Sequence, residues 1–301
     1  MPCSSTEPGP GANVRRFVGW TFAVVLIGPT TVAAQKTPGA DDLATTLALV
    51  GRQVEDYYAR ARSIVSTERV LLQPLRSDLT PDESGRHLVY ELRVEWEPPA
   101  PGETAGGAQI VRQLLSVNGR PPRPKDEPGC TDPRPVSPEP LTVFLLSRRE
   151  QYSFSWAGRG RTNRRASVLL EYRDSSSKPP EIRWKGECVT IDVPAKTRGR
   201  AWVDPETGDV LRLDESFVGL FDVPLPREHR KSGGPASMTI ERADTSIRYR
   251  EVKFADPDET VLLPATIDTL LIVRNAGTPR LRMTQTFSNY RRFTTESRIV
   301  R

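Results

Sequence analysis

Histidine is the side chain most often used as a general base and is a common metal ligand, and the 301-residue chain has only two, His87 and His229. His87 lies on the polar side of an alternating segment, and His229 lies among basic residues. Either could act as a catalytic base. However, the two are not spaced as metal ligands, and no histidine is near Cys130 or Cys188 in the sequence. We therefore interpret both as solvated side chains and predict no metal site and no cofactor.

Carboxylates are the other groups that could do chemistry, and they crowd two short connections: Asp204, Glu206 and Asp209 in one, and Asp256, Asp258 and Glu259 in the other. Such groups could bind calcium or work as a catalytic pair. Neither segment has the spacing of a calcium loop, and turn chemistry accounts for both. The sequence also has no P-loop, no Gly-x-Ser-x-Gly elbow and no dinucleotide fingerprint. We expect no catalytic residues, with a carboxylate-dependent hydrolase as the weaker alternative.

Residues 1–34 have the three parts of a secretory signal peptide: a polar start ending in Arg15 and Arg16, an apolar run over 17–27, and small residues up to Ala34. The apolar run is shorter than the roughly 20 residues needed to span a bilayer, so we prefer cleavage after Ala34 to a retained anchor. The two arginines also allow a twin-arginine signal, although the flanking residues fit general secretion better. The sequence therefore predicts a periplasmic or secreted protein.

Two cysteines lie outside this leader, Cys130 in a proline-rich stretch and Cys188 in a strand-like segment. In an oxidising compartment the simplest expectation is a disulfide between them. Two free thiols are the alternative, because pairing does not follow from sequence alone.

A basic cluster lies between two alternating segments, where it forms the tip of an expected hairpin: Arg159, Arg161, Arg164 and Arg165. Aromatic residues alternate along the first arm at 152–156, so this end of the hairpin could touch an anionic membrane surface. The alternative is an aromatic stripe that faces the core, with a solvated loop. The formal charge of +5 is a mild excess. For an exported protein it favours anionic lipid, cell-wall polymer or polysaccharide over nucleic acid.

The elements that position these groups begin with a helix. Asp41 and Asp42 are good N-cap residues, and apolar residues then recur at three- and four-residue spacing: Leu43, Leu47, Val50, Val54, Tyr57, Ala61 and Ile64. This pattern predicts an amphipathic helix over residues 41–64, roughly 36 Å long. Its apolar stripe must pack against another element.

Strands follow the helix. Between His87 and Trp96 the pattern alternates, with Leu88, Tyr90 and Leu92 on one face. Further strands are expected at 110–117, 152–156, 168–172, 181–184, 188–193, 200–204, 210–217, 247–254, 260–274 and 281–293. The segment 141–146 could be strand or helix, and the proline-rich stretch at about 120–140 is expected to be an extended loop.

This inventory predicts the architecture, because a twisted antiparallel sheet of roughly ten strands curls and its concave face must be filled. The helix is the available filler. We therefore predict an α+β fold in which a strongly curved antiparallel sheet, a half-barrel, wraps around the N-terminal helix. The expected organisation is a leader at 1–34, a short linker at 35–40, one domain at 41–296 with a proline-rich insertion, and a tail at 297–301.

Three features of the sequence match the pattern of one family. The first is the helix through Val54, Glu55, Asp56, Tyr57 and Tyr58, which leads by Ser63 and Ile64 into a strand ending at Gln73. The second is the segment 199–212, with Trp202, Asp204, Pro205, Thr207 and Gly208, and the third is the strand ending at 287–293. In these features the chain resembles the periplasmic lipoprotein-carrier superfamily, which is LolA-like with RseB-like and LppX-like relatives. It departs from the family pattern in its proline-rich insertion and basic hairpin tip.

The resemblance implies a hydrophobic cavity between sheet and helix. We therefore expect an exported binding protein, associated with the periplasm or the outer membrane, that shields acyl chains or a lipidated partner. The expected lining residues are Leu47, Val54, Leu88, Tyr90 and Leu92. A second hypothesis from another class is an envelope sensor or scaffold, in which the same groove is filled by side chains and the loops hold a protein partner.

Overall fold

The computed structural model describes residues 40–61, 63–96, 108–126, 130, 132, 139–186, 188–193, 196–230 and 233–292. The predicted leader, nearly all of the linker, the tail and most of the proline-rich insertion lie outside these residues. Among the described residues, no helix is both long enough and apolar enough to cross a membrane.

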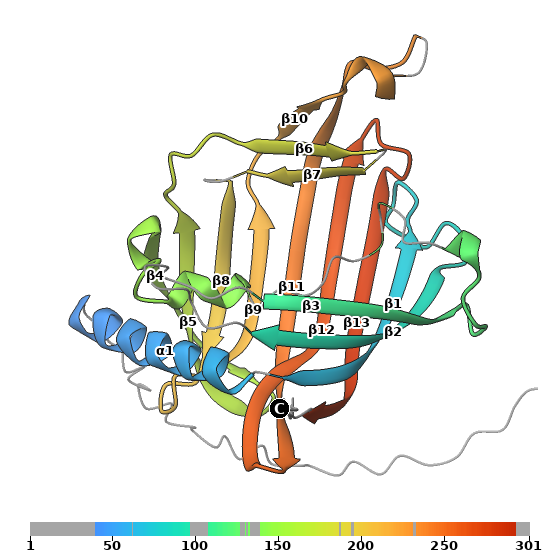
Figure 1. Cartoon of the computed structure of the whole chain (residues 1–301). Helices are drawn as coiled ribbons and strands as arrows, with labels where there is room; N and C mark the ends of the chain where they lie inside the picture. The colour runs from blue at the N-terminus through green and yellow to red at the C-terminus, as the bar shows by residue number, and fades with distance from the viewer. Residues whose placement is uncertain are drawn as a thin grey trace, which may run out of the picture. The chain divides into compact units, whose positions relative to one another are not determined.

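One α-helix precedes a series of antiparallel strands (Figure 1). The elements are α1 (Ala40–Arg60), β1 (Ile64–Pro74), β2 (Arg86–Trp96), β3 (Ala108–Val117), β4 (Tyr152–Thr162), β5 (Arg165–Asp174), β6 (Glu181–Lys185), β7 (Cys188–Asp192), β8 (Thr197–Val203), β9 (Val210–Phe217), β10 (Phe221–Pro224), β11 (Ser237–Ala255), β12 (Asp258–Arg274) and β13 (Arg280–Arg292). Short 3-10 turns lie at Pro124–Asp126, Glu139–Phe144, Arg149–Gln151 and Arg227–His229.

The main sheet has the strand order β3-β2-β1-β13-β12-β11-β9-β8-β5-β4, with β10 paired to β11, and it is not closed. Figure 1 shows that it bends strongly, since β2 and β3 run across the view while β8, β11 and β12 run up it. The predicted α+β half-barrel is therefore confirmed. The β6–β7 hairpin forms a separate two-stranded sheet, so the expectation that its strands continue the main sheet is wrong.

The helix is shorter than predicted. It begins at Ala40, which places Asp41 and Asp42 in its first turn rather than at the cap, and it ends at Arg60 instead of residue 64. Ser63 has a positive φ of 54°, and Ile64 already starts β1. Ala61 and Ile64 are both buried, so the apolar spacing runs on past the end of the helix because the connection faces the same core.

Most strand predictions are confirmed to within a few residues. The main exceptions are β11, which at 19 residues is far longer than the predicted 247–254, and β10, which was not predicted. β4 also runs on to Thr162, so Arg159 and Arg161 of the predicted tip lie in the strand. The ambiguous segment 141–146 falls largely in a 3-10 turn, Glu139–Phe144. Its residues Leu141, Val143 and Phe144 are buried in the main core. The periodicity of such a short apolar run does not distinguish a buried strand from a buried helix. The sequence alone therefore did not assign this segment.

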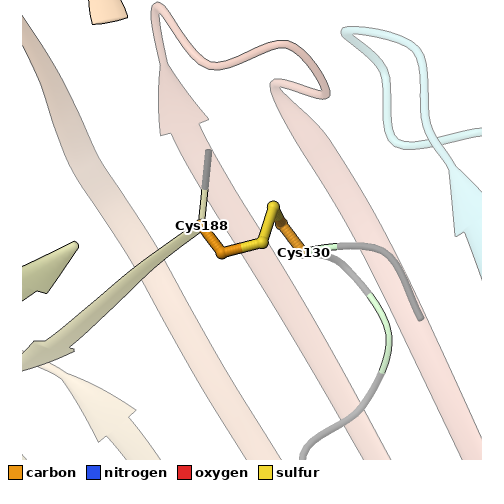
Figure 2. The surroundings of a disulfide bond; sticks show 2 residues. All are labelled: Cys130 and Cys188. Carbon is orange, nitrogen blue, oxygen red and sulfur yellow. A yellow bond between two sulfur atoms is a disulfide. The ribbon is translucent and has the colours of Figure 1, made fainter. Parts of the chain in front are cut away.

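The disulfide between Cys130 and Cys188 is confirmed (Figure 2), with a Cα–Cα distance of 5.0 Å. It closes a separation of 58 residues and joins the proline-rich stretch to the first residue of β7.

The turn between β8 and β9 is where α1 meets the sheet. Asp204 accepts hydrogen bonds from the backbone N–H groups of Glu206 and Thr207, at 2.9 and 3.1 Å. Gly208 follows with a φ of 80°, and a Cβ atom there would lie 2.8 Å from Leu49 Cγ of α1. Both the conformation and the close approach require glycine at this position.

We therefore predict that Gly208→Ala lowers the free energy of unfolding by about 1–3 kcal/mol, because alanine adds backbone strain and a clash with Leu49. The measurement is urea denaturation followed by circular dichroism. Gly277→Ala is the matched control, since Gly277 has open space around its Cβ position and no positive φ. Equal effects of the two substitutions would show that the turn does not hold the helix.

Candidate functional site

The hollow of the sheet next to α1 is the candidate site. Leu47 and Val54 of α1 are buried in one apolar cluster together with Leu92 of β2. The same cluster includes Tyr249 of β11 and Leu213 of β9. The apolar stripe of α1 therefore shares one core with strands that are far apart in the order of the sheet.

One small pocket among the described residues lies under the helix. The space bounded by Val54, Tyr57, Tyr249 and Leu262 has a volume of about 20 Å³. A water molecule needs at least roughly 10–15 Å³ by the same kind of measure, so this space holds about one water and no acyl chain. At this place the hollow is occupied by the side chains of α1 itself.

The predicted lining residues do not form one group. Leu88 and Tyr90 are buried, but they belong to a second cluster with Val70, Leu72 and Leu281. Leu47, Val54 and Leu92 are in the first cluster. The structure thus brings together three of the five predicted residues and places the other two in a separate part of the core.

A polar group that the sequence analysis missed lies on β1, β3 and β13, which also contribute residues to these clusters. Glu68 of β1 is fully buried, and Arg112 of β3 lies 2.9 Å from its carboxylate with a side chain only 10% exposed. Gln285 donates to Glu68 Oε1 at 2.7 Å, and the guanidinium of Arg112 lies 4.9 Å from the centre of the Tyr90 ring. The sequence did indicate that Glu68 is buried. It lies two residues from Val70 and four from Leu72, so in a strand its side chain points to the same inward face as theirs.

Burial raises the pKa of Glu68, and the charge of Arg112 and the hydrogen bonds from Gln285 and Arg112 oppose that rise. A buried ion pair of this kind contributes little net stability, yet removing one partner leaves an uncompensated charge. The three side chains therefore act as a unit.

A few polar contacts hold α1 in place. Gln53 donates to Asp209 Oδ1 at 2.6 Å, and Arg149 donates to the carbonyl of Leu47 at 2.8 Å. At the C-terminal end of the helix, Arg292 donates to the carbonyl of Arg60 at 2.6 Å. Arg60 also donates to the carbonyl of Thr260 in β12 at 3.2 Å, and apolar packing adds to these contacts.

The predicted basic tip is partly engaged inside the protein. Arg165 lies 2.7 Å from Asp204, 3.1 Å from Asp209 and 3.0 Å from Glu251. The other three predicted residues of the tip are exposed: Arg159, Arg161 and Arg164. Only these three are available to a membrane surface.

The aromatic residues of β4 face the core, as the alternative interpretation expected. Tyr152 and Phe154 pack against the main apolar cluster and contact the ring of Tyr172 at centroid distances of 5.9 and 6.1 Å. Trp156 packs against the same cluster.

The acidic turn is explained by its hydrogen bonds. Although burial opposes the effect, the N–H groups of Glu206 and Thr207 and the guanidinium of Arg165 lower the pKa of Asp204. Within the residues that the structure describes, no cluster of three or more histidine, cysteine or acidic side chains is arranged to hold a metal ion. His87 is exposed, and His229 stacks on Trp184 of β6 with ring centroids 4.6 Å apart.

Acidic side chains also line a depression of about 250 Å³ formed by β9, β11 and β12. Asp214 accepts from Arg212 and from Ser246, at 2.6 and 2.7 Å, and Asp244 pairs with Arg242. These carboxylates link neighbouring residues and strands of the sheet, which accounts for them without a reaction.

Comparison with known proteins gives likeness to solved structures. No family model and no curated protein matches the chain. The chain is similar to a putative outer membrane lipoprotein-sorting protein domain from Vibrio parahaemolyticus, with 9% identity, a TM-score of 0.41 and coverage of 84% of this chain and 94% of the other. A LolA superfamily protein from Nitrosomonas europaea gives 8% identity, a TM-score of 0.35 and coverage of 82% and 94%. The MucA/MucB complex of Pseudomonas aeruginosa gives 9% identity, a TM-score of 0.20 and coverage of 81% of this chain and 99% of the other.

The first of these structures is named for lipoprotein sorting and the second for the LolA superfamily. This is the group that the chain resembles in the three sequence features described above. With TM-scores below 0.5, they do not bear on what this protein binds.

The polar group at Glu68 leads to a prediction about pH. Arg112→Met should lower the free energy of unfolding by about 3–5 kcal/mol at pH 8, because ionised Glu68 is left buried without its partner. A carboxyl whose pKa is raised by folding adds stability below its unfolded pKa, and that stability is lost as pH rises through the folded pKa. The loss caused by Arg112→Met should therefore be smaller at pH 5.

Urea denaturation at both pH values checks this, with Arg93→Met as the control because the Arg93–Glu91 pair is exposed. The double variant Glu68→Gln with Arg112→Met should recover part of the loss at pH 8. A loss that does not depend on pH would contradict the assignment.

Proposed function

We propose that this protein is an exported, non-enzymatic binding protein of the periplasm or outer membrane, and that it holds the acyl chains of a lipid or lipidated protein in the hollow of its sheet. The observation that supports it is the contact between the apolar stripe of α1 and the apolar hollow. A guest of the same chemistry can replace that stripe, because apolar burial is not directional and contributes about 25 cal/mol per Å². Leu92 would then line the site, Leu47 and Val54 would leave it with α1, and Leu88 and Tyr90 would stay in the second cluster.

The small volume under α1 determines how such a guest enters. The pocket bounded by Val54, Tyr57, Tyr249 and Leu262 has room for about one water, so on this proposal the helix moves when an acyl chain binds there. Its C-terminal end is joined to β1 by the short connection 61–63, so the helix opens by swinging about that end. α1 then serves as a lid that occupies the site until the guest arrives.

A second candidate function is supported by a different observation. β3 is an edge strand of the main sheet, and its outward residues Val111 and Leu115 are 58% and 44% exposed. An edge strand with exposed apolar side chains can pair with a strand of another chain. In this alternative the protein is an envelope sensor or scaffold, and the filled hollow is structural.

Native mass spectrometry of protein purified without detergent separates the two functions. A co-purifying apolar molecule, extracted and identified, supports the acyl-chain carrier. A stable protein complex without lipid, lost in the Val111→Lys and Leu115→Lys double variant, supports the scaffold.

The lid leads to a quantitative prediction. Gln53→Ala removes the hydrogen bond to Asp209, worth about 1 kcal/mol, and so raises the open fraction about fivefold. Because apparent affinity scales with that fraction, we expect the variant to bind cis-parinaric acid about fivefold more tightly in a fluorescence titration. Glu55→Ala, on the exposed side of the same helix, should bind as the wild type does. Unchanged or weaker binding by Gln53→Ala would rule out the lid.

A further inference from the structure

A pocket of about 420 Å³ lies where the tip of the β4–β5 hairpin meets β9, β11 and β12. β9 pairs with β11 only as far as Arg248, and the register of β11 with β12 shifts just after that residue. The side chain of Asn163, in the hairpin tip, donates to the carbonyl of Tyr249 at 3.1 Å. The pocket therefore occupies a break in the sheet that the hairpin tip borders.

Two arginines of β11, Arg248 and Arg250, line this pocket. Both are exposed, and within the described chain neither makes an ion pair. The one carboxylate in the lining, Glu251, lies 3.0 Å from Arg165 and is already paired. Arg250 donates only to the carbonyl of Phe287, at 3.3 Å, and its guanidinium lies 5.7 Å from the centre of the Tyr290 ring. The pocket thus holds two positive charges without a counter-charge.

The two arginines lie two residues apart on β11, and both are exposed. Residues two apart on a strand point to the same face with Cα atoms about 6.6 Å apart. Two guanidinium groups offer two planar forks of donors, whereas a carboxylate is satisfied by one of them. A phosphate group has enough oxygens for both forks.

Part of the remaining lining is apolar, beside the polar residues Asn163, Arg165 and Thr266. Leu211, Leu262 and Ala265 contribute to it, and Leu211 is almost completely buried. A pocket of this volume with an apolar wall has room for a small organic group joined to the phosphate.

We propose that this pocket binds a phosphate group, either as free phosphate or as the headgroup of an anionic phospholipid. The site adjoins the pocket under α1, with which it shares Tyr249 and Leu262, but the proposal does not depend on the acyl-chain function. It also differs from the predicted membrane-contacting tip, because Arg165 is paired with acidic residues and the two arginines that make no ion pair within the described residues come from β11.

The test uses the whole purified protein with two probes: inorganic phosphate, followed by isothermal titration calorimetry and thermal unfolding, and vesicles of phosphatidylcholine with or without phosphatidic acid, followed by sedimentation. The variants are Arg248→Gln, which removes no hydrogen bond that the structure shows, and the double variant with Arg250→Gln. The control is Arg173→Gln with Arg198→Gln. These two exposed arginines face each other across β5 and β8, and within the described residues neither makes an ion pair.

We expect wild type to bind at least one of the two probes saturably, Arg248→Gln to weaken binding about tenfold, the double variant to abolish it, and the control to change it less than twofold. Binding to phosphatidic acid vesicles but not to free phosphate identifies a headgroup as the source, and the reverse identifies a soluble phosphate compound. The proposal is overturned if neither probe binds, or if the control weakens binding as much as the double variant does.

Discussion

The structure depends on one packing constraint, which is that the apolar stripe of α1 must be covered, and the hollow of the bent sheet and the turn Glu139–Phe144 together cover it. Leu47, Val50 and Val54 are all less than 9% exposed in the structure. Because most of the stability of a helix in a protein comes from the packing of its apolar face, the 21-residue helix α1 needs the sheet as much as the sheet needs a filler. The β8–β9 turn, with Gly208 against Leu49, fixes where the two meet.

The interior is divided in a way that limits what the hollow can hold. Its main apolar cluster lies under α1, a second lies between β1, β2 and β13, and the polar group of Glu68, Arg112 and Gln285 lies on the strands that carry both. Under the proposed function, an apolar guest is restricted to the part that α1 covers, since passing the polar group would remove partners from a buried carboxylate. The geometry favours one short site with a lid over a long open channel.

Much of the fold could be predicted from the sequence, because periodicity reports burial directly. The alternation in β2, the helix stripe, the β8–β9 turn and the Cys130–Cys188 bond were all predicted. The end of the helix was not, because Ala61 and Ile64 stay buried after the backbone has left the helix. The separate β6–β7 sheet and the partners of Arg165 were missed as well, since both depend on contacts between distant strands that no local pattern records.

Hydrogen exchange across Ala40–Arg60, followed by mass spectrometry, tests the central claim most directly. The account predicts slow exchange in the free protein, because α1 is packed in the hollow, and clearly faster exchange when a saturating fatty acid takes its place and leaves the helix in water. Fast exchange in the free protein would show that the helix does not close the hollow. Exchange that stays equally slow with the fatty acid bound would show that the guest does not replace it.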